Sequence, residues 1–274
     1  MPEHDIVHAA ALIDGADALL ICAGAGMGVD SGLPDFRGDA GFWQAYPALG
    51  SARIPFHEIA NPASFRTDPA LGWGFYGHRL DLYRNTEPHA GFRILLEMAH
   101  TRPGGAFVFT SNVDGQFGHA GFADERIVEC HGSIHHLQCT RPCSDAIWAA
   151  DAFRPEVDAP ACRLLNDPPR CPHCGALARP NILMFNDSGW VDTRTDAQFA
   201  RLQAWRAGIG TLVVIELGAG VNIPSVRRMS ERQRAPLVHI NPRAPQLDGC
   251  AGVGLALGAL DALERIEEAR SSQR

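Results

Sequence analysis

The chain has 274 residues, of which 46% are hydrophobic and 20% are charged, and its formal net charge is −7. This composition excludes disordered and fibrous classes, and the length allows one large domain or a large domain with a smaller insertion. No apolar run approaches the roughly 18 residues of a membrane span, and residues 1–14 lack a signal-peptide pattern, so we expect a cytoplasmic protein that does not bind membranes. The excess of 31 acidic over 24 basic residues argues against general nucleic-acid binding.

Short apolar runs alternate with helical patterns along the chain. The runs predict buried strands at residues 18–22, 106–109, 211–215 and 236–240. Apolar residues spaced three and four apart predict helices at residues 71–84, 89–100, 196–205 and 255–266. Residues 38–66 indicate a mobile loop with short helices, and residues 135–179 indicate a separate small lobe. The alternation predicts an α/β fold with a parallel sheet covered by helices on both sides.

A glycine-rich turn follows the first predicted strand. Gly24, Gly26 and Gly28 would let the backbone approach a pyrophosphate closely, with amide donors aimed at it. The usual dinucleotide fingerprint has its third glycine where this chain has Val29. The turn alone therefore leaves two interpretations, a nucleotide site and a tight turn between strand and helix.

The loop after this turn carries Asp35, Phe36 and Arg37. Glycine and proline hold these residues out of regular structure, and such a loop presents side chains instead of packing them. The alternative is a solvated turn with a local contact between aspartate and arginine.

Polar residues also follow the later predicted strands. Asn112 and Asp114 come directly after residues 106–109, and parallel sheets bind ligands where their strands end. His131 follows another short apolar stretch and is a plausible general base, because the pKa of histidine lies near neutrality. Two further loops could approach a nucleotide through glycines and an amide: Gly218, Ala219, Gly220 and Asn241.

Four of the eight cysteines form two close pairs separated by a long loop: Cys139 and Cys143, then Cys171 and Cys174. This spacing predicts a structural zinc ribbon, in which four thiolates close a tetrahedral site and leave no open position for chemistry. His173 or Cys162 could replace one of the four ligands.

Together, these stretches resemble the sirtuin family of NAD-dependent protein deacylases, in order and over nearly the whole chain. The matching residues are Gly24 to Arg37, Thr110 to Asp114, His131-Gly132, the two cysteine pairs, Gly218 to Gly220 and Ile240-Asn241. The resemblance implies a single catalytic core over residues 1–274. Its larger, Rossmann-like lobe would span about 1–38, 101–134 and 180–270, and its smaller lobe would hold a helical module at about 39–100 and the zinc ribbon at about 135–179.

The resemblance also implies NAD as co-substrate, a structural zinc ion and acylated lysine side chains of proteins as partners. His131 would be the base, with Asn112 as a second catalytic residue. The residues expected to bind NAD are Ala23, Gly24, Ala25, Gly26, Met27, Asp35, Phe36, Arg37, Ser111, Asn112, Asp114, Gly218, Ala219, Gly220 and Asn241. The implied products are deacylated lysine, nicotinamide and O-acyl-ADP-ribose.

Several positions depart from the family pattern. Gly28 stands where a serine is usual, and Ser111 stands where a glutamine is usual. The substrate strand, which normally ends Phe-Gly-Glu, reads Phe185-Asn186-Asp187, and Phe185 is expected to bind substrate.

Tyr76 and Arg79 match a Tyr-x-x-Arg pair of desuccinylase-like members of the family. Residues three apart share a helix face, and arginine can bind a carboxylate through two hydrogen bonds. The pair predicts a preference for succinyl or malonyl groups, and the alternative is a surface arginine beside a packed tyrosine.

Two rival functions remain open. Because the same cleft would activate the same glycosidic bond, the chain could be a sirtuin-like NAD glycohydrolase or a protein ADP-ribosyltransferase. The cysteine pairs alone would also permit a zinc-ribbon binding module without catalysis.

Overall fold

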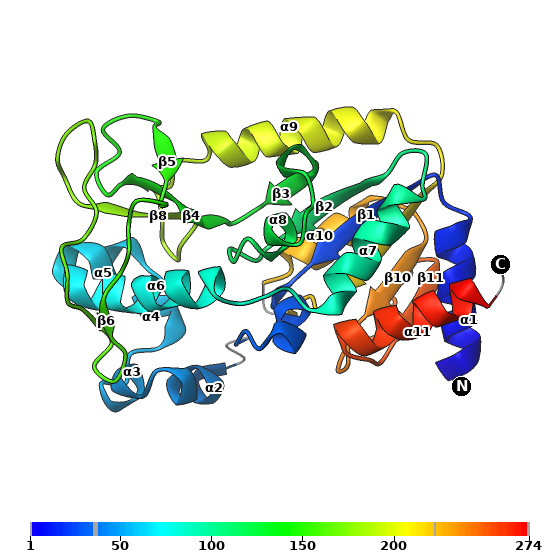
Figure 1. Cartoon of the computed structure of the whole chain (residues 1–274), viewed down its shortest axis with the longest axis horizontal. Helices are drawn as coiled ribbons and strands as arrows, with labels where there is room; N and C mark the ends of the chain where they lie inside the picture. Colours follow the sequence, from blue (N-terminus) through cyan, green and yellow to red (C-terminus); the bar gives the residue numbers. More distant parts are fainter. Residues whose placement is uncertain (1, 35–37, 222, 273–274) are drawn as a thin grey trace.

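A six-stranded parallel sheet forms the centre of the larger part of the molecule (Figure 1). The computed structural model describes residues 2–34, 38–221 and 223–272, so the predicted site residues Asp35, Phe36 and Arg37 lie outside the described residues. The sheet has the order β11-β10-β9-β1-β2-β3, and every strand pair is parallel, as the sequence predicts. Its strands are β1 (Ala18–Ala23), β2 (Ala106–Thr110), β3 (Ile127–Glu129), β9 (Leu212–Leu217), β10 (Leu237–Ile240) and β11 (Gly252–Leu255).

Helices bury both faces of this sheet, because successive side chains of a strand point to opposite faces. Leu19 and Ile21 pack in one core cluster with α1 (Pro2–Asp14), α7 (Ala90–His100) and α11 (Ala259–Ser271). Leu20 and Cys22 pack in another with residues of α9 (Thr193–Ala207) and α10 (Ser225–Arg232). The continuous apolar run of β1 is thus explained by burial on both faces.

The strand order places a ligand crevice at the first turn. The chain builds the sheet from β1 through β2 to β3, and then starts again on the other side of β1 with β9. The connections after β1 and β9 therefore run to opposite faces of the sheet, and parallel sheets bind ligands at such a switch point, at the carboxyl ends of the strands. A 3-10 helix, η1 (Ala25–Ser31), follows β1 directly.

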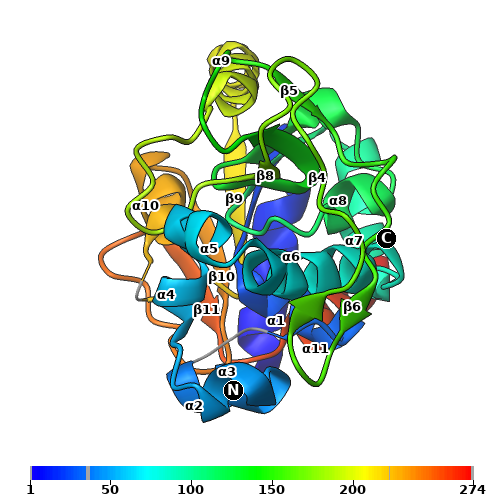
Figure 2. The ribbon, with the colours of Figure 1, turned by 90° about the vertical axis from the view of Figure 1, so that its left-hand side faces the viewer.

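A second group of elements lies at one end of the large sheet (Figures 1 and 2). It contains the antiparallel sheet β5 (Ile147–Ala149), β4 (Gly132–Cys139) and β8 (Ala178–Ile182), and the pair β6 (Val157–Asp158) and β7 (Arg163–Leu164). Its helices are α2 (Gly38–Ala45), α3 (Pro47–Ser51), α4 (Phe56–Ile59), α5 (Pro62–Thr67) and α6 (Pro69–Arg84). Its core is largely aromatic, with Phe42, Phe65, Trp73, Phe75 and Tyr76 buried together.

Several elements differ from the sequence-based expectation. Residues 39–100 are expected in the smaller lobe, yet Phe92 and Leu95 of α7 pack in the core of the large sheet. The helix predicted at residues 255–266 begins only at Ala259, because Leu255 ends β11. The short α8 (Gln116–His119) and η2 (Asp124–Arg126) connect β2 to β3. Among the described residues, no helix is both long enough and apolar enough to cross a membrane.

Candidate active site

Two glycine loops meet at the carboxyl ends of β1 and β9. The Gly24 amide donates to the Leu217 carbonyl oxygen at 2.9 Å, and the Gly26 amide donates to Gly218 at 3.1 Å. Gly218 has a φ of +58°, and a Cβ there would lie 2.4 Å from the Gly26 Cα. The two loops can therefore touch only because both are free of side chains at this point. Gly220 faces open space, as does the exposed Ala25, so the joined loops keep a side on which a ligand can lie.

Asn241 holds these loops together. Its Nδ2 donates to the Ala219 carbonyl oxygen at 3.0 Å, and its Oδ1 accepts from the amides of Arg243 and Ala244 at 3.1 Å each. Both ends of the side-chain amide are thus engaged with backbone. The structure brings Asn241 to the predicted crevice, where it fixes the loop after β10 against the loop after β9.

Asn112 and Asp114 lie in the loop after β2, next to the first glycine loop. The Asn112 Nδ2 donates to the Gly24 carbonyl oxygen at 3.0 Å, and the Thr110 Oγ1 donates to Ala23 at 3.0 Å. Asp114 is buried, and its Oδ1 accepts from the Gln116 amide at 2.9 Å. Burial raises the pKa of the Asp114 carboxyl to about 6, because the charged form loses its hydration.

His131 lies between β3 and β4 and reaches the same region. The Cys130 amide beside it donates to the Thr110 carbonyl oxygen at 2.9 Å, which ties its loop to the end of β2. Its Nε2 lies 3.3 Å from the Ser225 Oγ at the start of α10. Burial lowers the pKa of His131, and a hydrogen bond with the Ser111 backbone partly opposes this effect. The ring is therefore neutral near pH 7, as a general base must be.

The predicted substrate strand runs past His131. The Leu183 amide donates to the His131 carbonyl oxygen and the Phe185 amide to the Ala60 carbonyl oxygen, both at 2.9 Å. Phe185 is 37% exposed, and its ring lies edge-on to Phe56 with the centroids 6.0 Å apart. The segment therefore connects the candidate base to the helical module and leaves an aromatic ring in contact with solvent.

The unusual residues Asn186 and Asp187 fit this segment. Asn186 has a φ of +54°, a conformation that asparagine tolerates better than most other residues with a side chain. Asp187 forms a buried ion pair with Arg179 at 2.8 Å and accepts from the Met184 and Gly189 amides. Asn186 thus accommodates a left-handed turn, and Asp187 supplies a buried acidic group after it.

Tyr76 and Arg79 lie on α6, buried in the aromatic core. The Arg79 Nε and Nη2 donate to the Tyr83 hydroxyl at 2.9 and 2.7 Å, and its guanidinium carbon lies 5.7 Å from the centre of the Tyr76 ring. Tyr76 stacks on Phe65. The interpretation of Arg79 as a surface arginine is therefore wrong, because only 7% of this residue is exposed.

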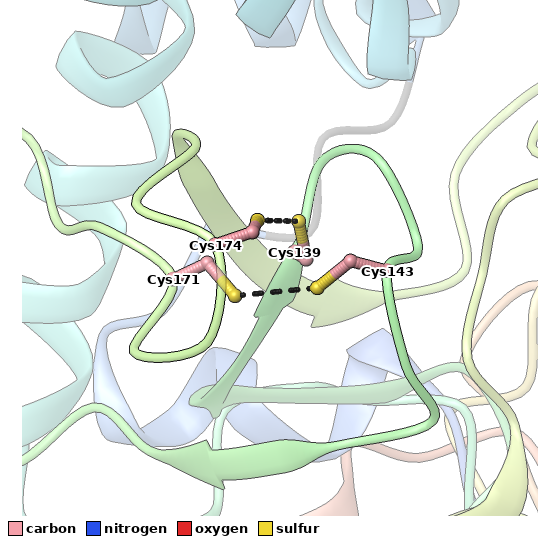
Figure 3. A group of neighbouring side chains, drawn as sticks. All are labelled: Cys139, Cys143, Cys171 and Cys174. Atoms are coloured by element: carbon pink, nitrogen blue, oxygen red, sulfur yellow. Dashed lines mark hydrogen bonds between the residues drawn. The ribbon is translucent and has the colours of Figure 1, made fainter.

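The four predicted zinc ligands come together (Figure 3). Cys139 Sγ lies 3.6 Å from Cys174 Sγ, and Cys143 Sγ lies 3.6 Å from Cys171 Sγ, and all four sulfurs lie within 4.8 Å of one another. A tetrahedron with zinc–sulfur bonds of about 2.3 Å has sulfur–sulfur edges of about 3.8 Å, so the cluster fits zinc. Cys162 packs in the aromatic core instead, and His173 is outside the cluster.

A cavity of about 340 Å³, lined by residues of α8 and β4 among others, reaches Asp114. Its lining includes Gln116, Glu129, His135 and Arg194, but neither Asn112 nor His131. The cavity therefore borders Asp114, but neither the glycine loops nor the candidate base line it.

Sequence reasoning included Thr110 in the Thr110 to Asp114 stretch without giving it a role, and it did not identify Ser225; the structure adds both to the site. Thr110 ends β2 and fixes the neighbouring Asn112, whose backbone amide donates to the Thr110 Oγ1 at 3.0 Å. Ser225 begins a helix of only eight residues, in which the apolar Val226 and Met229 form too short a pattern to predict a helix, so no signal pointed to Ser225.

Comparisons with known proteins agree with this arrangement. A model of the Sir2 family matches residues 24–205. A protein named NAD-dependent protein deacylase from Methylococcus capsulatus is 32% identical, over 86% of each chain. Another of the same name, from Aeropyrum pernix, is 29% identical over 90% of this chain and 89% of its own.

Solved structures share the fold. A Sir2 homologue in complex with NAD superimposes with a TM-score of 0.72 at 23% identity, covering 97% of this chain and 94% of its own. A second Sir2 enzyme structure gives a TM-score of 0.72 at 21% identity, over 99% and 100% of the two chains. The fold, the cysteine cluster and the family match lead to one conclusion: this chain belongs to the Sir2 family.

Proposed function

We propose that the chain is an NAD-dependent protein lysine deacylase that yields deacylated lysine, nicotinamide and O-acyl-ADP-ribose. The observation that carries this proposal is that the loops after β1, β2 and β9 meet at one edge, with His131 beside them. The relatives named above as NAD-dependent protein deacylases support it. Free thiols throughout the described residues fit work in the reducing cytoplasm.

The residues divide the work as follows. The glycine loops, with Ala23 to Met27 on one side and Gly218 to Gly220 on the other, would lie along the phosphates and adenosine of NAD. Asn112 and Asp114 would line the nicotinamide pocket. The loop after β8, with Phe185, would hold the acylated lysine across the cleft.

In the reaction, the acyl oxygen of the lysine substrate attacks C1′ of the nicotinamide ribose and nicotinamide leaves. The protein's part in this step is to align the two substrates and stabilise the charge that develops. His131 then accepts a proton from a ribose hydroxyl through its neutral ring, and this hydroxyl oxygen attacks the acyl carbon. Addition of water to this carbon and cleavage of its bond to nitrogen then release the lysine amine and leave the acyl group on the ribose. NAD is consumed in this reaction and is not reduced.

The test is mass spectrometry of the products from NAD and a panel of acyl-lysine peptides. We expect O-acyl-ADP-ribose in equal amount to nicotinamide, loss of turnover in His131→Ala, and normal turnover in the control His100→Ala at an exposed position. Turnover that survives in His131→Ala would contradict the proposed role of His131 as the base. Absence of NAD-dependent turnover in the wild-type protein would instead favour a zinc-ribbon binding module without catalysis.

A finer part of the proposal concerns the acyl group, for which we infer a preference for succinyl or malonyl. The Arg79 guanidinium is buried close to the Tyr76 ring and donates to the Tyr83 hydroxyl, and an arginine can bind the carboxylate of a succinyl or malonyl group through two hydrogen bonds. We expect Arg79→Met to lower the turnover ratio of succinyl-lysine to acetyl-lysine at least about tenfold. Arg93→Met, an exposed change of the same charge, should leave the ratio unchanged. An unchanged ratio in Arg79→Met would refute the preference.

A second candidate is NAD hydrolysis or ADP-ribosyl transfer to protein. Ser111 favours it, because this short side chain stands where a glutamine would reach toward the ribose, and the structure places Ser111 against both Ala23 and His131. Nicotinamide release at the same rate with and without acyl-peptide, or ADP-ribose on an acceptor protein, would favour this candidate over deacylation.

A further inference from the structure

The start of α10 contacts the candidate base. Ser225 is the first residue of this helix, and its Oγ lies 3.3 Å from Nε2 of His131. We propose that Ser225 is a positioning residue for His131, and that a buried ion-pair network under α10 holds Ser225 in place. This inference rests on the proposed function, in which His131 takes a proton from substrate.

The chemistry of the contact sets its direction. An imidazole can act as a base only through a nitrogen that carries a lone pair, and a serine hydroxyl can donate to that nitrogen only while it is unprotonated. The hydrogen bond with the Ser111 backbone holds the ring from another side. With Nε2 unprotonated, the Ser225 hydroxyl donates to it, which orients the ring and stabilises its neutral form until the ribose hydroxyl takes the place of the serine at this nitrogen.

The helix that carries Ser225 is anchored by charge. Arg227 lies two residues after Ser225. Its Nε donates to Glu216 Oε1 at 3.1 Å, and its Nη2 lies 3.0 Å from His239 Nε2. His239 Nε2 also lies 3.1 Å from Glu216 Oε1. Glu216 and His239 are fully buried neighbours on β9 and β10, so the side chain of Arg227 is drawn down onto the sheet.

A second contact holds the far end of the helix. Ser230 is buried and hydrogen-bonds with the thiol of Cys22 on β1, the residue that pairs with Glu216 across the sheet. Val226 packs between these polar contacts. The inner face of α10 is thus fixed to β1, β9 and β10, and Ser225 has little freedom to move away from His131.

The groups around the His131 ring are neutral within the described residues. Its pKa shift arises from burial and from the Ser111 backbone. The thiol of the adjacent Cys130 stays protonated, because burial raises its pKa to about 12. On α10, the charge of Arg227 is paired with Glu216 and Asp248. A change in the titration of His131 after loss of the serine hydroxyl can therefore be assigned to that hydroxyl.

The test is an NMR titration of the His131 ring nitrogens in the full-length protein. We expect Ser225→Ala to raise the proton affinity of His131 about two- to tenfold, since the bond that favours the neutral ring is lost, and Ser225→Thr to restore it. We expect kcat to fall by a similar factor while KM for NAD changes by less than about twofold. Arg227→Met should shift His131 in the same direction, whereas Arg228→Met, exposed on the same helix, should not.

The outcomes separate the two proposals. An unchanged titration of His131 in a folded Ser225→Ala variant would overturn the positioning role, whatever the activity. If the wild-type protein shows no deacylation but Ser225→Ala shifts the titration of His131 as expected, the proposed function is refuted and the positioning role of Ser225 is supported. If Arg227→Met unfolds, Ser225→Ala and Ser225→Thr still decide the question.

Discussion

The buried ion pair of Arg179 and Asp187 gives the sharpest stability prediction. Both side chains are at most 1% exposed, and the pair spans 2.8 Å. Asp187→Ala leaves the guanidinium buried without its counter-charge and removes an acceptor from two backbone amides. Removing one partner of a buried pair costs about 3–5 kcal/mol in free energy of unfolding, and a chain of this size then melts about 6–20 °C lower.

The assay is urea and thermal unfolding followed by circular dichroism at constant zinc concentration. Glu97→Ala removes one partner of an exposed pair with Arg93 and should cost less than about 1 kcal/mol. The double variant Arg179→Met/Asp187→Leu should recover part of the loss, because two apolar side chains can replace a buried pair. A loss below about 1 kcal/mol in Asp187→Ala, or a double variant that is no better than the single one, would refute this reasoning.

Three further predictions follow from the site. Mutation of Cys171 to serine should abolish stoichiometric zinc in metal analysis and lower the melting temperature, whereas Cys250→Ser should retain one zinc per chain. Because burial raises the pKa of Asp114 to about 6, the folded state prefers the protonated carboxyl, and stability should fall as pH rises from about 4 to about 6. Asp114→Asn should then stabilise the fold at pH 8, by at most about 3 kcal/mol, but not at pH 4, while raising KM for NAD. Gly218→Ala should destabilise the chain and weaken NAD binding, because its Cβ would meet Gly26, whereas melting of Gly220→Ala should match wild type.

The sheet and the cysteine cluster could be predicted from the sequence because their signals are local. The run at residues 18–22 is apolar throughout, and the structure buries it on both faces. The spacing of the cysteines was sufficient to predict that Cys139, Cys143, Cys171 and Cys174 form one cluster, as the structure shows. These features depend on residue type and separation, which are visible before folding.

The remaining elements depend on contacts that the sequence does not show. Strand β11 is short and carries glycines, so its Leu255 was counted into the following helix. The inner face of α10 combines the apolar Val226 and Met229 with the polar Arg227 and Ser230, and a helix of eight residues is too short for this mixed pattern to be recognised in the sequence. Arg79 could not be placed in an aromatic core from its own helix, since that core also contains Phe42 and Tyr46 from outside the helix.

One strand links the two halves of the site. His131 stands directly before β4, and Cys139 ends it, a separation on the order of 20 Å. Loss of the zinc ion would destabilise the end of β4 at Cys139. Because β4 and β8 are paired along their length, fraying that begins there can extend to His131. A chelator would then inhibit the enzyme slowly and by partial unfolding, although the metal takes no part in bond making. Inhibition by a chelator would therefore be no proof of a metal-dependent reaction, and its time course would distinguish the two cases.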